Sequence, residues 1–236
     1  MQTKNLYFLG DIHAEFEWLK LEISRKKVND ATIIQVGDFG LGFRKDESLQ
    51  LSSLNVLCRT NNIQLHVIRG NHDDPSRFDS GDLYSNLKFL KDYSILKLDG
   101  ISILLAGGAI SIDRLWKMEN GTYWGDERFV FSPSRLSQIK KEINTIDIVV
   151  THSAPREVYP YVHDPIVQRY SKYDPALEND LVLDRLEHSK FYEYLKLIDL
   201  TPHFWYYGHF HKSNVQVVER TRFQLLGINE IVKHKQ

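Results

Sequence analysis

The chain has 236 residues, of which 30 are basic and 31 acidic, so its formal net charge is −1. This balance excludes a whole-chain field that would draw the protein onto nucleic acid or an anionic membrane. Hydrophobic residues make up 42% and charged residues 26% of the chain, which is typical of a folded globular protein and excludes a disordered one. The length predicts a single domain over residues 1–236.

A single cysteine, Cys58, excludes an internal disulfide. It lies beside Leu54 and Leu57 on the expected apolar face of a helix, which favours burial over catalysis. No apolar run approaches the ~20 residues needed to cross a bilayer. The first ten residues also lack the apolar core of a secretory signal. We therefore expect a cytoplasmic protein with no membrane partner.

The first 70 residues alternate between strand and helix patterns. Short β-branched and aromatic runs predict buried strands at 6–9, 31–36 and 65–68. Between them, apolar residues recur at helical spacing over 16–23 and 51–58. This βαβαβ order predicts a parallel sheet, and ligands of such sheets collect beyond the carboxyl ends of the strands.

The same alternation continues along the rest of the chain. Strands are predicted at 101–105, 146–150 and 204–207, a helix near 136–143, and a terminal hairpin at 214–219 and 222–226. We expect the sheet to continue past residue 100. Residues 155–203 are rich in proline and tyrosine, with a helical stretch near 181–197. This insertion is either a lid or specificity wall, or a plain packed excursion.

Five strands end in polar motifs that could bind metal. In chain order the motifs are Gly10-Asp11-Ile12-His13, Gly37-Asp38, Gly70-Asn71-His72-Asp73, Thr151-His152 and Gly208-His209-Phe210-His211. Residues i and i+2 of an extended chain project to one side, so Asp11 with His13, and His209 with His211, are expected to converge as pairs. The glycine before four of the motifs is expected to allow tight turns and close approach.

The donor set predicts two divalent cations. Carboxylates, imidazoles and one amide carbonyl suit Mn, Fe, Zn, Ni or Mg rather than a thiolate centre. Seven candidate ligands exceed the needs of one ion but satisfy two if a carboxylate bridges them, the arrangement used for in-line displacement at phosphorus. We expect two divalent ions, with Mn favoured and Fe, Zn, Ni or Mg as alternatives.

The ordered set of motifs, from residue 10 to residue 211, resembles the calcineurin-like metallophosphoesterase superfamily. The resemblance implies an α/β fold, a four-layer α/β/β/α sandwich with two mixed sheets. It implies that one ion is held by Asp11, His13 and His211, that the other is held by Asn71, His152 and His209, and that Asp38 bridges them. It further implies attack on phosphorus by a metal-bridging hydroxide, with His72 protonating the leaving oxygen or stabilising its charge. Asp73 either orients His72 or braces its loop.

The second motif departs from that of the serine/threonine protein phosphatases in this superfamily. Their longer motif carries a second, later Asp that supports the catalytic His and an Arg that grips phosphate, and neither follows Asp38 in residues 37–43 here. Arg114, behind the Gly107-Gly108 pair, is a candidate substitute, with Arg44, Arg69 and Arg77 as rivals. A structural or surface role is favoured for each of them. The other histidines, His66, His163, His188, His203 and His234, are assigned no role.

The leading interpretation is a phosphomonoesterase or phosphodiesterase that acts on a small phosphorylated molecule or nucleotide. A nuclease is the second interpretation, although the sequence shows no long basic run beyond residues 25–27. A phosphoesterase-like scaffold that binds protein partners is the third, and an unliganded His72 beside a complete ligand set argues against it. The oligomeric state is left open.

Overall fold

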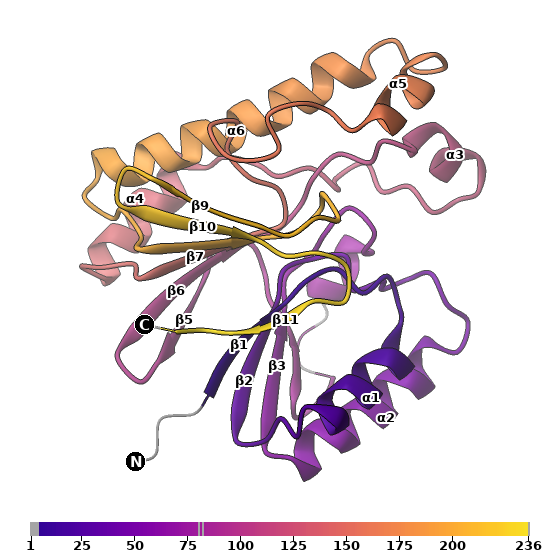
Figure 1. Ribbon diagram of the computed structural model, residues 1–236, viewed down its shortest axis with the longest axis vertical. Helices are drawn as coiled ribbons and strands as arrows, with labels where there is room; N and C mark the ends of the chain where they lie inside the picture. The colour runs from indigo at the N-terminus through magenta and orange to yellow at the C-terminus, as the bar shows by residue number, and fades with distance from the viewer. Residues whose placement is uncertain (1–4, 80, 82, 236) are drawn as a thin grey trace.

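The computed structural model describes residues 5–79, 81 and 83–235. Two β-sheets lie face to face, and helices cover the outer face of each, so the fold is a four-layer α/β/β/α sandwich (Figure 1). The first sheet has the strand order β11-β1-β2-β3-β4 and the second the order β5-β6-β7-β8-β10-β9. Both sheets are mixed, because each combines parallel and antiparallel pairs.

The first layer pair comes from the N-terminal third of the chain and one C-terminal strand. Its strands are β1 (Asn5–Leu9), β2 (Ala31–Gln35), β3 (Ile63–Val67), β4 (Leu87–Phe89) and β11 (Ile231–Lys233). Helices α1 (Phe16–Arg25) and α2 (Glu47–Thr60) cover its outer face. Phe16, Leu19 and Ile23 form the buried stripe of α1, and Leu54 and Cys58 belong to that of α2. The helical periodicity and the burial of Cys58 are thus confirmed.

The second layer pair is built from later strands and helices. Its strands are β5 (Ser94–Leu98), β6 (Ile101–Ala106), β7 (Ile148–Thr151), β8 (Phe204–Tyr207), β9 (Asn214–Val218) and β10 (Thr221–Leu225). Helices α4 (Pro133–Glu142) and α6 (Leu177–Leu197) pack on its outer face, where Leu136, Phe191, Tyr192 and Trp205 share one apolar cluster. Two short helices, α3 (Arg114–Glu119) and α5 (Pro165–Ser171), and the 3₁₀ turn Pro75–Phe78 complete the fold.

The two sheets meet through a separate apolar layer. Alternate residues of β1 point to opposite faces, so Phe8 enters this layer while Leu9 faces the helices. The Phe8 ring stacks on Tyr206 of the second sheet with 3.6 Å between ring centroids. Ile34, Ile103 and neighbouring apolar side chains fill the rest of the layer. This packing fixes the two sheets relative to each other.

Strand register brings the carboxyl ends of the parallel strands to one edge in each sheet. Leu9 pairs with Gln35 and Gln35 with Val67 in the first sheet. In the second sheet Ala106 pairs with Thr151. The residues that follow these strands therefore emerge at common edges.

Six predicted strands, the terminal hairpin and four predicted helices are present, with ends shifted by a few residues. The strand pattern alone suggested one sheet continuing past residue 100, which was wrong, whereas the two mixed sheets implied by the family resemblance are confirmed. Strands from residue 94 onward form a second sheet, and only β11 returns to the first. The pattern along the chain identifies buried strands but carries no information about which sheet each one joins. Within the described residues, no helix is long and apolar enough to span a membrane.

Candidate metal centre

All five polar motifs lie together at the carboxyl ends of the central strands. The structure contains two groups of potential metal ligands, one comprising Asp11, His13, Asp38 and His211 and the other Asp38, His152 and His209. Within each group the donor atoms lie within 4.8 Å of one another. Asp38 belongs to both groups. The convergence predicted from the strand ends is therefore present.

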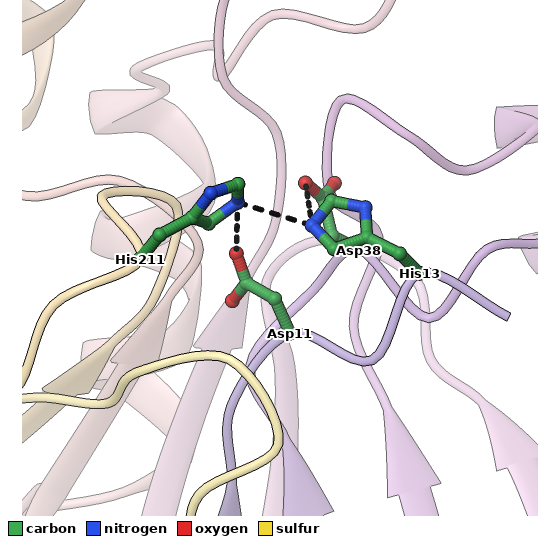
Figure 2. A group of neighbouring side chains, drawn as sticks. All are labelled: Asp11, His13, Asp38 and His211. Atoms are coloured by element: carbon green, nitrogen blue, oxygen red, sulfur yellow. Dashed lines mark hydrogen bonds and ion pairs between the residues drawn. The ribbon is translucent and has the colours of Figure 1, made fainter. Parts of the chain in front are cut away.

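In the first group, side chains from the two sheets face each other (Figure 2). His13 Nε2 lies 3.0 Å from His211 Nε2 and 3.9 Å from Asp38 Oδ2. His211 Nε2 also lies 3.4 Å from Asp11 Oδ2. Asp11 accepts a hydrogen bond from the His209 backbone N–H at 3.0 Å, which joins the first and last motifs.

The second group lies deeper and includes an amide oxygen. His152 Nε2 is 3.2 Å from Asp38 Oδ1 and 3.1 Å from Asn71 Oδ1. His152 Nδ1 lies 2.8 Å from the Val36 carbonyl oxygen, and this contact orients the ring. The His209 ring is edge-on to the His152 ring, with centroids 5.0 Å apart. Asn71 thus joins the second group, where the family resemblance places it.

The expectation from the extended-chain rule that His209 and His211 converge as a pair was wrong, whereas their assignment to different ions, which the family resemblance implies, agrees with the two groups. They fall into different groups, because neither residue lies in extended backbone: φ is +70° at His209 and +53° at His211. His13 also has a positive φ, +43°, although it does lie in the same group as Asp11. The i, i+2 rule holds within strands, and these ligands lie on the turns that follow them.

Two glycines show why the motifs need a residue without a side chain. A Cβ on Gly70 would lie closer than 3.0 Å to Asp38 Oδ1, and one on Gly208 closer than 3.0 Å to Asp11 Oδ1. Real Cβ atoms do not approach oxygen so closely. The expected role of these glycines in allowing close approach is confirmed.

Burial and neighbouring charges shift the pKa values of the ligand side chains in opposite directions. Asp11, Asp38 and His152 are buried. Burial opposes ionisation of Asp38, but His152 and His72 outweigh it and hold the pKa of Asp38 well below its ordinary value. Burial likewise lowers the pKa of His152, yet the Asp38 carboxylate overrides it and raises that pKa to about 9.

The other imidazoles respond differently to the same surroundings. Burial lowers the pKa of His13 and lowers that of His209 well below the ordinary range. The hydrogen bond to Asp11 raises the pKa of His211. The lowered pKa values of His13 and His209 favour the neutral imidazole, which is the form that binds divalent cations, whereas the raised pKa values of His152 and His211 oppose it.

His72 lies next to the first group. It is half-buried, and its ring is edge-on to His13 at 5.2 Å and tilted against Phe43 at 5.8 Å. Its backbone N–H donates to Asp38 Oδ1 at 2.7 Å. Asp73 accepts hydrogen bonds from the backbone N–H groups of residues 39, 40, 41 and 70. Of the two roles considered for Asp73, these contacts favour bracing the loop.

The four arginines considered as phosphate ligands make ion pairs elsewhere. Arg114 pairs with Asp174 and Asp180 and is buried. The other pairs are Arg69 with Asp92, Arg44 with Asp46 and Arg77 with Glu47. Gly107 and Gly108 pack closely on Arg69 and do not carry Arg114 to the ligand groups. The structural role favoured for these arginines agrees with these contacts.

A cavity of about 470 Å³ opens beside the two ligand groups. Asp38, His72 and His209 line this cavity together with residues of the 155–203 insertion. Its walls include the apolar residues Ile112, Val162, Ile166, Val167 and Leu181 and the charged residues Asp113, Asp164, Asp184, Arg185 and Lys212. Sequence reasoning missed Asp184 and Arg185 because α6 has no motif, and it gave no role to His163, which also lines the cavity.

The donor set fits divalent cations. Two buried carboxylates, four imidazoles and an amide oxygen converge there. The 3.0 Å between His13 Nε2 and His211 Nε2 can be spanned by one ion with metal–nitrogen bonds of about 2.1 Å. A cation would also offset the cost of burying two carboxylates.

Comparisons with known proteins agree with this arrangement. The model of the calcineurin-like phosphoesterase family matches residues 4–213. A search of curated protein sequences gives no match.

Solved structures show the same fold at low sequence identity. TT1561 of Thermus thermophilus is 11% identical with a TM-score of 0.57, and the match covers 99% of both chains. Phosphopantetheinyl hydrolase of Mycobacterium tuberculosis is 16% identical with a TM-score of 0.51, over 96% of this chain and 90% of that one. A putative 5′-nucleotidase of Staphylococcus aureus, in complex with α-ketoglutarate, is 14% identical with a TM-score of 0.50, over 96% of this chain and 49% of that one. Since the family model spans nearly the whole chain, the protein belongs to the calcineurin-like phosphoesterase family.

Proposed function

We propose that this protein hydrolyses the phosphoric ester bond of a small phosphorylated organic molecule or nucleotide with the help of two divalent cations, Mn being favoured. The observation that carries the proposal is the pair of ligand groups that share Asp38, a residue that also lines the cavity. A shared carboxylate between two sets of O and N donors suits a two-ion phosphoesterase.

The contacts between these side chains support two ligand sets. One cation would be held by Asp11, His13, His211 and Asp38, and the other by Asn71, His152, His209 and Asp38. When bound, the two ions would activate a water molecule and neutralise phosphoryl oxygens. The buried Asp38 and Asp11 would supply negative charge to the cations. His152, His209 and His211, which follow strands of the second sheet, would bind the cations from the opposite side.

His72 is the proposed proton donor to the leaving oxygen. It lines the cavity, belongs to neither ligand group and lies next to His13. The bond from its backbone N–H to Asp38 fixes the loop, and the contact with Phe43 restricts the ring. An imidazole so placed can transfer a proton from a ring nitrogen to a departing alkoxide.

The cavity favours a small substrate over nucleic acid. Its volume lies within the range of small-molecule sites. Its two basic side chains are both engaged, since Arg185 donates to four backbone carbonyls and Lys212 pairs with Asp164. Asp113 Oδ1 is buried without a hydrogen-bond partner. Acceptors of this kind suit hydroxyl or amino groups of an organic leaving group, and we assign the insertion the role of a specificity wall.

The test is an activity assay on protein with a measured metal content. Protein stripped with chelator is reloaded with Mn, Ni, Zn or Mg, and the bound ions are counted by elemental analysis. Hydrolysis of p-nitrophenyl phosphate, bis-p-nitrophenyl phosphate, a cyclic nucleotide and a single-stranded oligonucleotide is then compared. We expect two ions per chain and turnover of at least one of the small esters.

The control is His203→Ala, which removes an exposed histidine outside both ligand groups. It should bind two ions and retain wild-type activity. Preferred cleavage of the oligonucleotide would replace the proposal with a nuclease. Two bound ions without hydrolysis of any substrate would favour a protein-binding scaffold.

A further inference from the structure

Behind Asn71 lies a buried polar cluster that makes no contact with the cavity. It consists of Ser111, Lys117 and Glu127, whose exposed fraction is 0% in each case. Lys117 is in α3, and the other two residues lie in the loops on either side of that helix. Full burial of a lysine is rare unless its charge is paired, so the contacts of this cluster indicate its purpose.

Each polar atom of the cluster has a defined partner. Lys117 Nζ donates to Ser111 Oγ at 2.6 Å, to Glu127 Oε2 at 3.0 Å and to the backbone carbonyl of Asn71. Glu127 accepts from the Ser111 hydroxyl at 2.7 Å through Oε2 and from the Ser111 backbone N–H at 2.8 Å through Oε1. Ser111 is therefore fixed through both its backbone and its side chain.

Every hydrogen-bonding position of the Ser111 hydroxyl is occupied. A serine hydroxyl offers one proton and two lone pairs. Its proton goes to Glu127, and one lone pair accepts from Lys117. The other faces Asn71 Nδ2 at 3.0 Å. Whichever end of the Asn71 amide faces Ser111 must be a donor.

This requirement determines which way the amide points. With Nδ2 on Ser111, Oδ1 faces the opposite direction and lies 3.1 Å from His152 Nε2. A flipped amide would set oxygen against a lone pair and would present N–H groups, which cannot bind a cation, to the second ligand group. We propose that Ser111, held by Lys117 and Glu127, is a positioning residue that keeps the Asn71 carbonyl oxygen directed at the second cation site.

The cluster is better suited to this role than to stabilising the fold. Desolvation of a buried Lys–Glu pair offsets most of its attraction, so apolar side chains of similar volume would stabilise the core at least as well. The Lys117–Glu127 pair does hold the Ser111 hydroxyl in a fixed orientation. Lys117 also lies 5.6 Å from the Trp124 ring, and Trp124 packs edge-on against Phe43, the neighbour of His72. The buried cluster thus contacts the proposed metal ligand Asn71 directly and the proposed proton donor His72 through Trp124 and Phe43.

The inference rests on the proposed two-cation site, but its first test needs no metal. In chelator-treated protein, the assigned side-chain amide of Asn71 is followed by ¹⁵N NMR. We expect slow hydrogen exchange in the wild type and at least 10-fold faster exchange in Ser111→Ala, because the acceptor is gone. Equal exchange rates would overturn the inference even if the protein bound two ions.

The second test measures Mn²⁺ binding by calorimetry. Loss of an outer partner of a metal ligand typically weakens binding about 10- to 100-fold. We expect a weakening in this range for one of the two ions in Ser111→Ala and Lys117→Met, with the other ion unaffected. Leu54→Ala, in the buried stripe of α2 and outside the five motifs, is the control for lost stability and should bind both ions normally.

A double-mutant cycle separates orientation from simple disruption. In Asn71→Asp either carboxylate oxygen can face the cation, so no flip needs to be prevented. Adding Ser111→Ala to Asn71→Asp should then change Mn²⁺ affinity less than 3-fold. An undiminished effect in that background, or equal weakening in Leu54→Ala, would show a merely structural role. A wild type that binds none of Mn, Ni, Zn and Mg would refute the proposed function, while the exchange measurement would still decide the orientation of Asn71.

Discussion

Asp38 Oδ1 lies 3.2 Å from His152 Nε2, although Asp38 follows β2 in the first sheet and His152 follows β7 in the second. The proposed metal centre therefore lies between the two sheets and takes ligands from both. The apolar layer that holds Phe8 against Tyr206 sets the distance between its halves. Binding of cations should in turn stabilise the association of the sheets.

Asp38→Asn tests the shared ligand. An amide retains the shape of the side chain but loses the charge that both cations would share. We expect fewer than two bound ions per chain by elemental analysis. Activity should fall at least ~100-fold, since metal ions supply several kcal/mol of charge stabilisation in such reactions. Glu178→Gln, which neutralises an exposed carboxylate on α6, should change neither quantity. Two ions bound as tightly as in the wild type would contradict the bridging role.

His72→Ala tests leaving-group assistance. Proton donation by a positioned side chain typically contributes about 10²- to 10⁴-fold. We expect a loss of this size for alkyl esters and a much smaller loss for p-nitrophenyl esters, whose leaving group needs no proton. The measurement is the dependence of kcat on leaving-group pKa at constant metal content. A loss that is the same for every leaving group would rule out proton donation by His72.

Gly208→Ala tests the close approach around Asp11. The added methyl group would collide with Asp11 Oδ1 and with the side chain of Val36. We expect unfolding to require about 1–3 kcal/mol less free energy, as for other overpacked sites, and one cation to bind more weakly. Gly125→Ala is the matched control, because a Cβ there meets no atom within 4 Å and φ is not positive. Both variants are compared by denaturant unfolding and by Mn²⁺ titration. Equal stability and equal Mn²⁺ affinity of Gly208→Ala and Gly125→Ala would show that the close approach of Gly208 to Asp11 is dispensable.

Much of the fold and of the ligand set could be predicted because both depend on local patterns. Buried strands are visible as short apolar runs, and a parallel βαβ order brings their carboxyl ends to one edge. Asp11, Asp38 and His152 were located in this way. The strand pattern did not predict the division of His209 and His211 between two groups, because this division depends on positive φ values in a turn that no apolar pattern records. The family resemblance, which assigned the two histidines to different ions, did predict it.

Other features depend on contacts between distant segments. The sequence of α3 gives no sign that Lys117 is fully buried, since its carboxylate partner, Glu127, lies beyond the helix and Asn71 lies 46 residues earlier. β11 is three residues long and pairs with β1 from the other end of the chain. Contacts of this kind, between segments far apart in the sequence, are evident only in the three-dimensional structure.

Asp184 predicts how stability depends on pH. Its carboxyl is buried in α6 beside the cavity, and burial raises its pKa to about 7 against the partial opposition of Ser153, His152, Arg128 and Arg185. The nearby His188 cannot supply a compensating charge, because burial lowers its pKa to about 3. A carboxyl whose pKa is higher in the folded than in the unfolded state favours folding while it is protonated. Its contribution is complete below pH 4 and is lost as the pH rises through about 7.

Asp184→Asn removes this dependence. The variant should match the wild type near pH 4 and exceed it in free energy of unfolding at pH 8, by up to about 4 kcal/mol at 1.36 kcal/mol for each unit of pKa. Urea unfolding in the presence of chelator from pH 4 to pH 8 measures the difference without a contribution from bound metal. Glu178→Gln, on the same helix but exposed, should show no comparable trend. If the two curves of Asp184→Asn and wild type stay parallel across this range, the Asp184 carboxyl does not change its protonation between pH 4 and pH 8 in the folded protein.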